Sequence, residues 1–128
     1  MARVGILRTS PESVVKDYPK LMRVVEYESF LDKNVKTILK LNLSWTLFFP
    51  ACSTPPWQLE GVLRTLKEDR YNDILAVENQ TVVTHPWKGA YYNKWLPILK
   101  KYGVEFQPLT DVEWIRYEPK AEMLAMYD

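Results

Sequence analysis

Short apolar runs alternate with amphipathic segments along this chain. The apolar runs predict strands, and segments with apolar residues three and four positions apart predict helices. The expected strands are Arg3–Thr9, Val35–Leu43, Asp73–Glu78 and Val104–Gln107, with an edge strand at Val112–Tyr117. The expected helices run from Val14 to Val25, from Pro56 onward, and from Tyr91 to Tyr102. This alternation predicts a three-layer α/β fold, Rossmann-like, with a mostly parallel sheet and helices on both faces.

Prolines and a glycine mark the expected ends of the helices. Ser10 followed by Pro11 is typical of a helix start, because proline fits the first helical position. Pro19 should kink or split the first helix, since it has no N–H to donate. Gly103 supplies the stop after the last helix. The segment Thr81–Ala90 is expected to be a loop.

The helix that opens on a double proline carries the clearest local signal. Its apolar stripe falls at i, i+3, i+4 and i+7 and consists of Leu59, Val62, Leu63 and Leu66. Pro56 fits the first helical position, which makes Pro55 the N-cap residue, and proline has no capping side chain. The N–H groups of residues 57–59 are then open to an anion, unless Ser53 or Thr54 caps them. Both alternatives stay open at the level of sequence.

Three loops are expected at the carboxyl ends of the strands, where parallel α/β sheets bind ligands. They are Ser44–Pro55, Asn79–Ala90 and Pro108–Asp111. We call the aromatic residues of this region the aromatic rim: Trp45, Phe48, Phe49, Trp57 and Trp87. These side chains either stack on a ligand or pack against more protein. We favour packing, and the expected outcome is self-association into at least a dimer or docking on a partner protein.

Few polar residues lie where they could form a site. Lys40 and Asn42 share one face of the second strand, and a lysine in a buried strand needs a partner or a ligand. Glu78 and Asn79 end the third strand, where a carboxylate could bind a sugar hydroxyl or cap a helix. His85, the only histidine, could be a general acid or base, or simply a surface residue. The candidate ligand-binding set is Lys40, Asn42, Ser53, Thr54, Trp57, Glu78, Asn79 and His85.

Composition narrows the class of protein. With 128 residues and 47% hydrophobic content, the chain is expected to form one soluble domain over residues 1–128. A net charge of +1 gives no electrostatic case for nucleic acid, and no apolar run predicts a membrane span. The lone cysteine, Cys52, excludes an internal disulfide, and together with the lack of an apolar leader it favours the cytoplasm. The chain has no phosphate-binding glycine motif, and no metal site or cofactor is expected in it.

The motifs quoted above resemble a known family over roughly residues 3–117. The strand RVGILRTSPESV, the Lys40-x-Asn42 strand and the Ser53-Thr54-Pro55-Pro56 helix start resemble the amino-terminal part of domain-of-unknown-function family three-six-two. Longer members of that family often carry ferredoxin-type iron–sulfur modules. The resemblance therefore implies either that this chain is the amino-terminal part of a longer architecture, as a fragment or a split gene product, or that it is a small stand-alone relative.

Two hypotheses of function remain at this point. The first is a binding or interaction domain that docks another chain through its aromatic rim. The second is the substrate-binding half of an enzyme for a small anionic ligand, with an iron–sulfur partner. The lack of a catalytic set favours the first hypothesis, and the cluster of Lys40, Asn42 and Thr54 favours the second.

Overall fold

A computed structural model describes residues 3–116 of the chain. Its sheet has three parallel strands in the sequential order β1-β2-β3, which are Thr37–Lys40, Ile74–Glu78 and Glu105–Pro108. The helices are α1 (Val14–Val24), α2 (Pro56–Glu68), α3 (Pro86–Tyr92) and α4 (Trp95–Lys101), with 3₁₀ turns at Tyr27–Ser29 and Leu109–Asp111. The fold is therefore of the mixed α/β class, and its parallel sheet was predicted.

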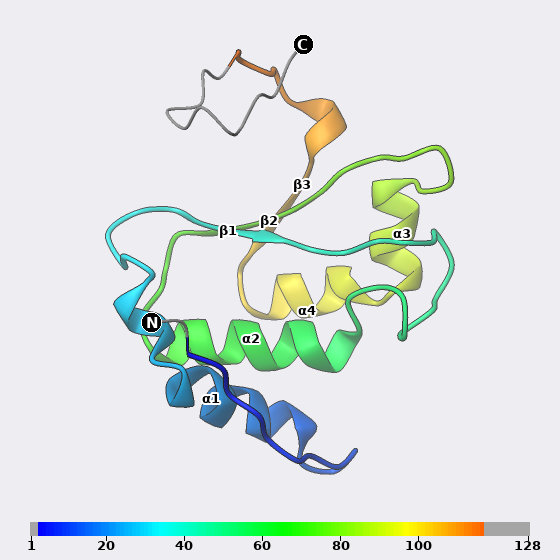
Figure 1. The fold of residues 1–128 in the computed structure, drawn as a ribbon. Coiled ribbons are helices and arrows are strands. Elements are labelled where there is room, and N and C mark those ends of the chain that lie inside the picture. Colours follow the sequence, from blue (N-terminus) through cyan, green and yellow to red (C-terminus); the bar gives the residue numbers. More distant parts are fainter. Residues whose placement is uncertain (1–2, 117–128) are drawn as a thin grey trace.

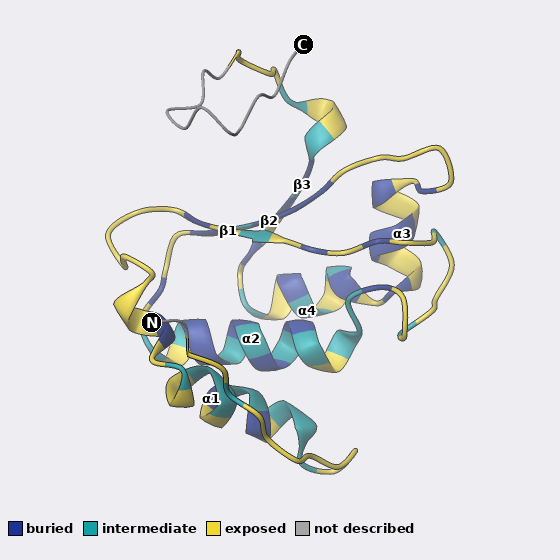
Figure 2. Cartoon of the chain, viewed as in Figure 1, coloured by how far each residue is buried: buried dark blue, intermediate teal, exposed yellow. Residues whose placement is uncertain are grey.

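The core lies between one face of the sheet and the helices α2 and α4 (Figure 1). The stripe of α2 contributes Leu59, Leu63 and Leu66, each at most 2% exposed, and α4 contributes Trp95 and Leu99. Ala76 and Phe106 face them from the sheet. The amphipathic pattern of α2 predicted this packing, and Figure 2 shows the buried stripe along the helix.

Helices on both faces of the sheet are not confirmed. In Figure 1, α2 and α4 lie on the same side of the sheet, and α1 packs on α2 from the side away from the strands. Crossovers between parallel strands are almost always right-handed, so a sheet that grows in one direction carries its crossover helices on one face. Ile38 on the opposite face is 62% exposed.

The predicted strand Arg3–Thr9 is wrong, because this segment forms no strand in the structure. It runs extended along α1, where Gly5 lies so close to Leu21 and Val25 that a Cβ atom would be only 2.8 Å from the Val25 side chain. The edge strand predicted at Val112–Tyr117 is also absent from residues 112–116, and Tyr117 lies outside the described residues. Both segments have strand-like patterns, but neither lies beside a strand with which it could pair.

The predicted helix Tyr91–Tyr102 is two helices, which begin at Pro86 and Trp95. Lys94 has a φ of +61°, and this left-handed residue separates them. A break here follows from Pro97, which has no N–H and fits the first turn of a helix rather than its middle. The predicted loop Thr81–Ala90 is therefore also wrong over its last residues.

The start of the first helix differs from the sequence prediction, whereas the end of α4 agrees with it. The first helix begins at Val14 rather than next to Ser10, and Pro19 lies inside it without splitting it. Gly103 follows α4 with a φ of +61°, which confirms the predicted stop. None of the described helices is both long enough and apolar enough to cross a membrane.

A carboxylate in the first turn of α1 holds the amino-terminal segment in place. Asp17 is buried and accepts hydrogen bonds from Lys20 Nζ at 2.8 Å, Ser13 Oγ at 2.6 Å and Thr9 Oγ1 at 2.9 Å. These donors, Lys20 first, lower the pKa of Asp17 from 3.8 to about 2. The ionised form is therefore the one that the fold stabilises.

Stability should consequently depend on this group in acid. A depressed pKa contributes stability that is fully present above the unfolded value and is lost as the pH falls from 3.8 towards 2. We expect the urea midpoint of the wild type to fall more steeply between pH 4 and pH 2 than that of Asp17→Asn. The control Asp73→Asn, at an exposed carboxylate, should keep the wild-type slope. Equal slopes for wild type and Asp17→Asn would contradict the assignment.

Candidate functional site

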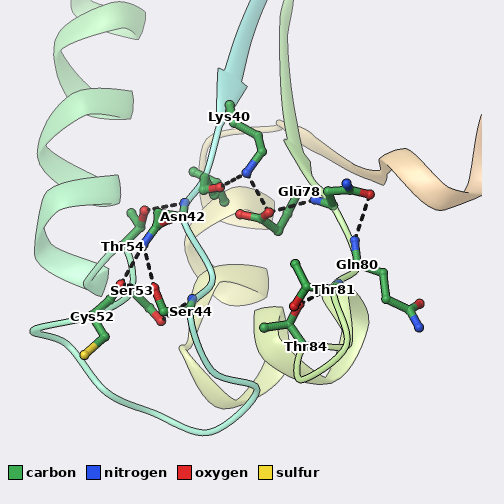
Figure 3. A network of polar contacts seen from close by, with 12 residues as sticks. Lys40, Asn42, Ser44, Cys52, Ser53, Thr54, Glu78, Gln80, Thr81 and Thr84 are labelled. Carbon is green, nitrogen blue, oxygen red and sulfur yellow. Dashed lines mark hydrogen bonds and ion pairs between the residues drawn. The ribbon is translucent and has the colours of Figure 1, made fainter. Parts of the chain in front are cut away.

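The carboxyl ends of β1 and β2 bring Lys40 and Glu78 together (Figure 3). Lys40 Nζ lies 2.6 Å from Glu78 Oε1 and also donates to the Leu41 carbonyl at 2.8 Å. The register places Lys40 opposite Val77, so its side chain reaches the last residue of β2. Both residues were candidates from the sequence, but their pairing with each other was not predicted.

Glu78 is the most deeply buried charged group of this region. Its side chain is only 4% exposed, whereas that of Lys40 is 53% exposed. Oε1 accepts from both Lys40 Nζ and the Asn79 N–H at 2.7 Å, but Oε2 has no hydrogen-bond partner among the described residues. A buried acceptor without a partner is uncommon and costs free energy.

Asn42, Ser53 and Thr54 form a polar clasp rather than an open site. The Asn42 N–H donates to Thr54 Oγ1 at 2.9 Å, and the Thr54 N–H donates to the Asn42 carbonyl at 2.8 Å. Asn42 Nδ2 donates to the Cys52 carbonyl at 2.6 Å, and the Ser44 N–H donates to Ser53 Oγ at 3.2 Å. These bonds close the base of the loop between residues 44 and 53, as Figure 3 shows.

The start of α2 has no side-chain cap, which was one of the two alternatives left by the sequence. Pro55 is the N-cap residue and Pro56 is the first helical residue, as predicted. Thr54 does not cap the helix, because its hydroxyl accepts from Asn42. The N–H groups of Gln58 and Leu59 donate to the Pro55 carbonyl at 3.1 and 3.2 Å, so two of the three N–H groups that were expected to be open to an anion, those of residues 57–59, are already bonded.

The remaining candidates are spread along the loops. Asn79 directly follows Glu78 in the chain. Its side-chain oxygen accepts a hydrogen bond from the Gln80 N–H at 2.9 Å. His85 is exposed and is the N-cap residue of α3. Trp57 lies in the first turn of α2 and is 40% exposed. The structure thus brings Lys40, Glu78 and Asn79 together and assigns Asn42, Ser53 and Thr54 to the clasp.

The aromatic rim is exposed throughout. Trp45, Phe48, Phe49, Trp57 and Trp87 are between 40% and 51% exposed. Trp45, Phe48 and Phe49 lie on the loop that the clasp closes, and Trp57 lies in the first turn of α2. The ring of Trp87 packs edge-to-face on Phe106, with ring centroids 5.2 Å apart. The rim residues therefore extend from ordered segments, and Trp57 lines a hollow together with Val14 and Val15 of α1.

Thr46 joins the two loops of the rim, which sequence analysis did not foresee. Its hydroxyl donates to the Val83 carbonyl at 3.2 Å and accepts from the His85 N–H at 3.1 Å. Trp95 was also missed as a site residue. It is fully buried, and its indole N–H donates to the Thr54 carbonyl at 2.7 Å, which ties α4 to the clasp. The only signal in the sequence was a tryptophan on the apolar side of a helix.

The donor types present limit the chemistry of this region. Within residues 3–116, no three His, Cys, Asp or Glu side chains gather as a metal would require. Cys52 is exposed, and its carbonyl rather than its thiol takes part in the clasp. The described residues of the site can bind and orient a group, but they form no nucleophile–base pair.

Comparisons of the chain with family models, with curated proteins and with solved structures found no match. The resemblance to domain-of-unknown-function family three-six-two accordingly stays a prediction.

Proposed function

We propose that this chain is a protein-interaction module that binds a second copy of itself or a partner protein through the aromatic rim. The observation that carries the proposal is the exposure of all five rim aromatics, of which Trp45, Phe48 and Phe49 lie on the loop after β1 and Trp57 and Trp87 in the first turns of α2 and α3. Clustered apolar surface of this kind marks interaction sites more often than it remains in water. Aromatic side chains also contribute much of the binding energy of protein interfaces.

The proposal includes the three-layer arrangement predicted from the sequence. The described helices leave one face of the sheet open around Ile38. In our proposal, another chain supplies the missing layer, with the rim as the adjacent contact. A partner carrying an iron–sulfur module, as the family resemblance implies, belongs to the same proposal.

The test is association in solution. We expect multi-angle light scattering at high protein concentration to give a mass above that of the monomer. The double variant Phe48→Ser/Phe49→Ser should raise the dissociation constant at least tenfold, because it removes two exposed aromatic anchors without touching the core. Val82→Ser is the matched control, since Val82 is fully exposed but lies outside the rim. A monomeric wild type at every concentration would contradict self-association.

A second candidate function is the binding of a small ligand, and the buried Oε2 of Glu78 is the observation that favours it. Pairing with Glu78 balances the charge of Lys40, so an anionic ligand would have to compete for that ammonium group. A ligand with an O–H or N–H donor would instead satisfy the carboxylate. Titration calorimetry with inorganic phosphate and with glycerol would separate the two classes, and no heat with either would remove this candidate.

A further inference from the structure

The described sheet has two edge strands, β1 and β3, and the edge along β1 is flanked by α2. In the described sheet β1 pairs only with β2. The Thr37 N–H donates to the carbonyl of Asp73, directly before β2, and the Leu41 N–H donates to the carbonyl of Val77 in β2. Since backbone groups alternate in direction along a strand, those of Ile38 and Lys40 point away from β2. Among residues 3–116, no backbone group donates to or accepts from them across this edge.

A hollow flanks this edge. It is lined by residues of β1, including Ile38 and Leu39, and by Gln58 and Val62 of α2. A strand placed beside β1 would cover these partly apolar side chains. Exposed strand edges with such neighbours are templates for pairing with another extended segment.

The same chain contains an extended segment whose backbone is unpaired. Arg3–Thr9 is rich in β-formers, and its backbone makes no hydrogen bond to the other described residues. Val4 and Ile6 point away from α1 and are 83% and 91% exposed. Gly5, between them, lies against α1. The segment therefore presents two β-branched side chains and unsatisfied backbone groups on its outer side.

The segment cannot reach β1 of its own chain while α1 stays in place. Figure 1 shows the amino-terminal segment on α1, with α2 between α1 and the sheet. Thr9 is bonded to Asp17, and Arg3 forms an ion pair with Glu26. The α1–α2 contact is close, because a Cβ on Gly61 would be 2.6 Å from Tyr18. A second copy has no such restriction.

We propose that Arg3–Thr9 of one copy pairs with the free edge of β1 in a second copy. Val4 and Ile6 then fill the hollow beside Val62, and the exchange is reciprocal about a two-fold axis, as in most dimers. Each pairing supplies acceptors and donors for the outward backbone groups of Ile38 and Lys40. The contact is distinct from the aromatic rim and stands whether or not the rim binds a partner.

Hydrogen exchange of the full chain, measured by NMR, tests the pairing directly. We expect the Ile38 and Lys40 amides to become at least tenfold more protected as protein concentration rises. Ile6→Pro should abolish that increase, because proline removes a donor and cannot continue a paired strand. Ile6→Val, which keeps the N–H group and the branched side chain, is the matched control. Circular dichroism checks that both variants fold.

Each other outcome overturns the proposal. Protection that does not change with concentration would show an open edge or pairing within one chain. Concentration-dependent protection that survives Ile6→Pro would show that another segment pairs with β1. The variant Phe48→Ser/Phe49→Ser should leave this protection unchanged, so failure of the rim as an interface and failure of the edge pairing give different results.

Discussion

Trp95→Ala should lower the free energy of unfolding by about 3–5 kcal/mol, the range for removing a fully buried tryptophan. Trp95 is 0% exposed and fills the space between α4 and the sheet, where it contacts Phe106 with ring centroids 6.3 Å apart. Its loss leaves a cavity and also removes the donor for the Thr54 carbonyl. Urea unfolding followed by circular dichroism measures the change.

Two further variants separate the contributions of Trp95. Trp95→Phe keeps most of the ring volume but leaves the Thr54 carbonyl without its donor, so we expect a cost of about 1–3 kcal/mol. Trp45→Ala, at an exposed tryptophan in the rim loop, should change stability by about 0.5 kcal/mol or less. If Trp95→Ala were no more destabilising than Trp45→Ala, the assignment of Trp95 to the core would be wrong.

Lys40→Met should lower the free energy of unfolding by about 2–3 kcal/mol. The change leaves the carboxylate of Glu78, only 4% exposed, without its charged partner. Removing one partner of a fully buried ion pair costs about 3–5 kcal/mol, and the half-exposed lysine reduces that value here. The measurement is again a urea unfolding curve at neutral pH.

The double variant Lys40→Met/Glu78→Gln is the decisive comparison. Glutamine keeps an acceptor for the Asn79 N–H but carries no charge that needs Lys40. The double variant should therefore be more stable than Lys40→Met alone, by about 1 kcal/mol or more. Additive costs for the two changes would mean that the Lys40–Glu78 contact contributes little to the fold.

The sequence pattern correctly predicted the parts of the fold that depend on interactions between residues close together in the chain. The stripe of α2, the proline at its first position and the stop at Gly103 all follow from rules that act within one turn of helix. The strands β1 and β2 were predicted from their apolar runs, although only β2 is buried on both faces and β1 leaves Ile38 exposed. Arg3–Thr9 is also rich in apolar residues. It forms no strand, because a strand must pair with the edge of another strand, and the local sequence does not show whether such an edge lies beside it.

The sequence identified residues of the candidate site but not the contacts that they make. Lys40 and Glu78 were both candidates from the sequence, with Glu78 at the end of its strand and Lys40 within a strand expected to continue to Leu43, whereas β1 ends at Lys40. The sequence did not predict their contact, which depends on the register of β1 against β2. The roles of Asn42 and Thr54 were also not predictable, since a short polar side chain bonds equally well to a ligand or to a nearby backbone.

The sequential strand order has a consequence for the kind of target this surface can hold. In open α/β sheets, ligand crevices form at a switch point, where neighbouring crossovers leave for opposite faces and their loops splay apart. No such reversal occurs among the described strands. The loops after β1 and β2 instead stay together, joined by the hydrogen bonds of Thr46 to Val83 and His85. Joined loops of this kind fit the proposed protein contact better than an enclosed small molecule.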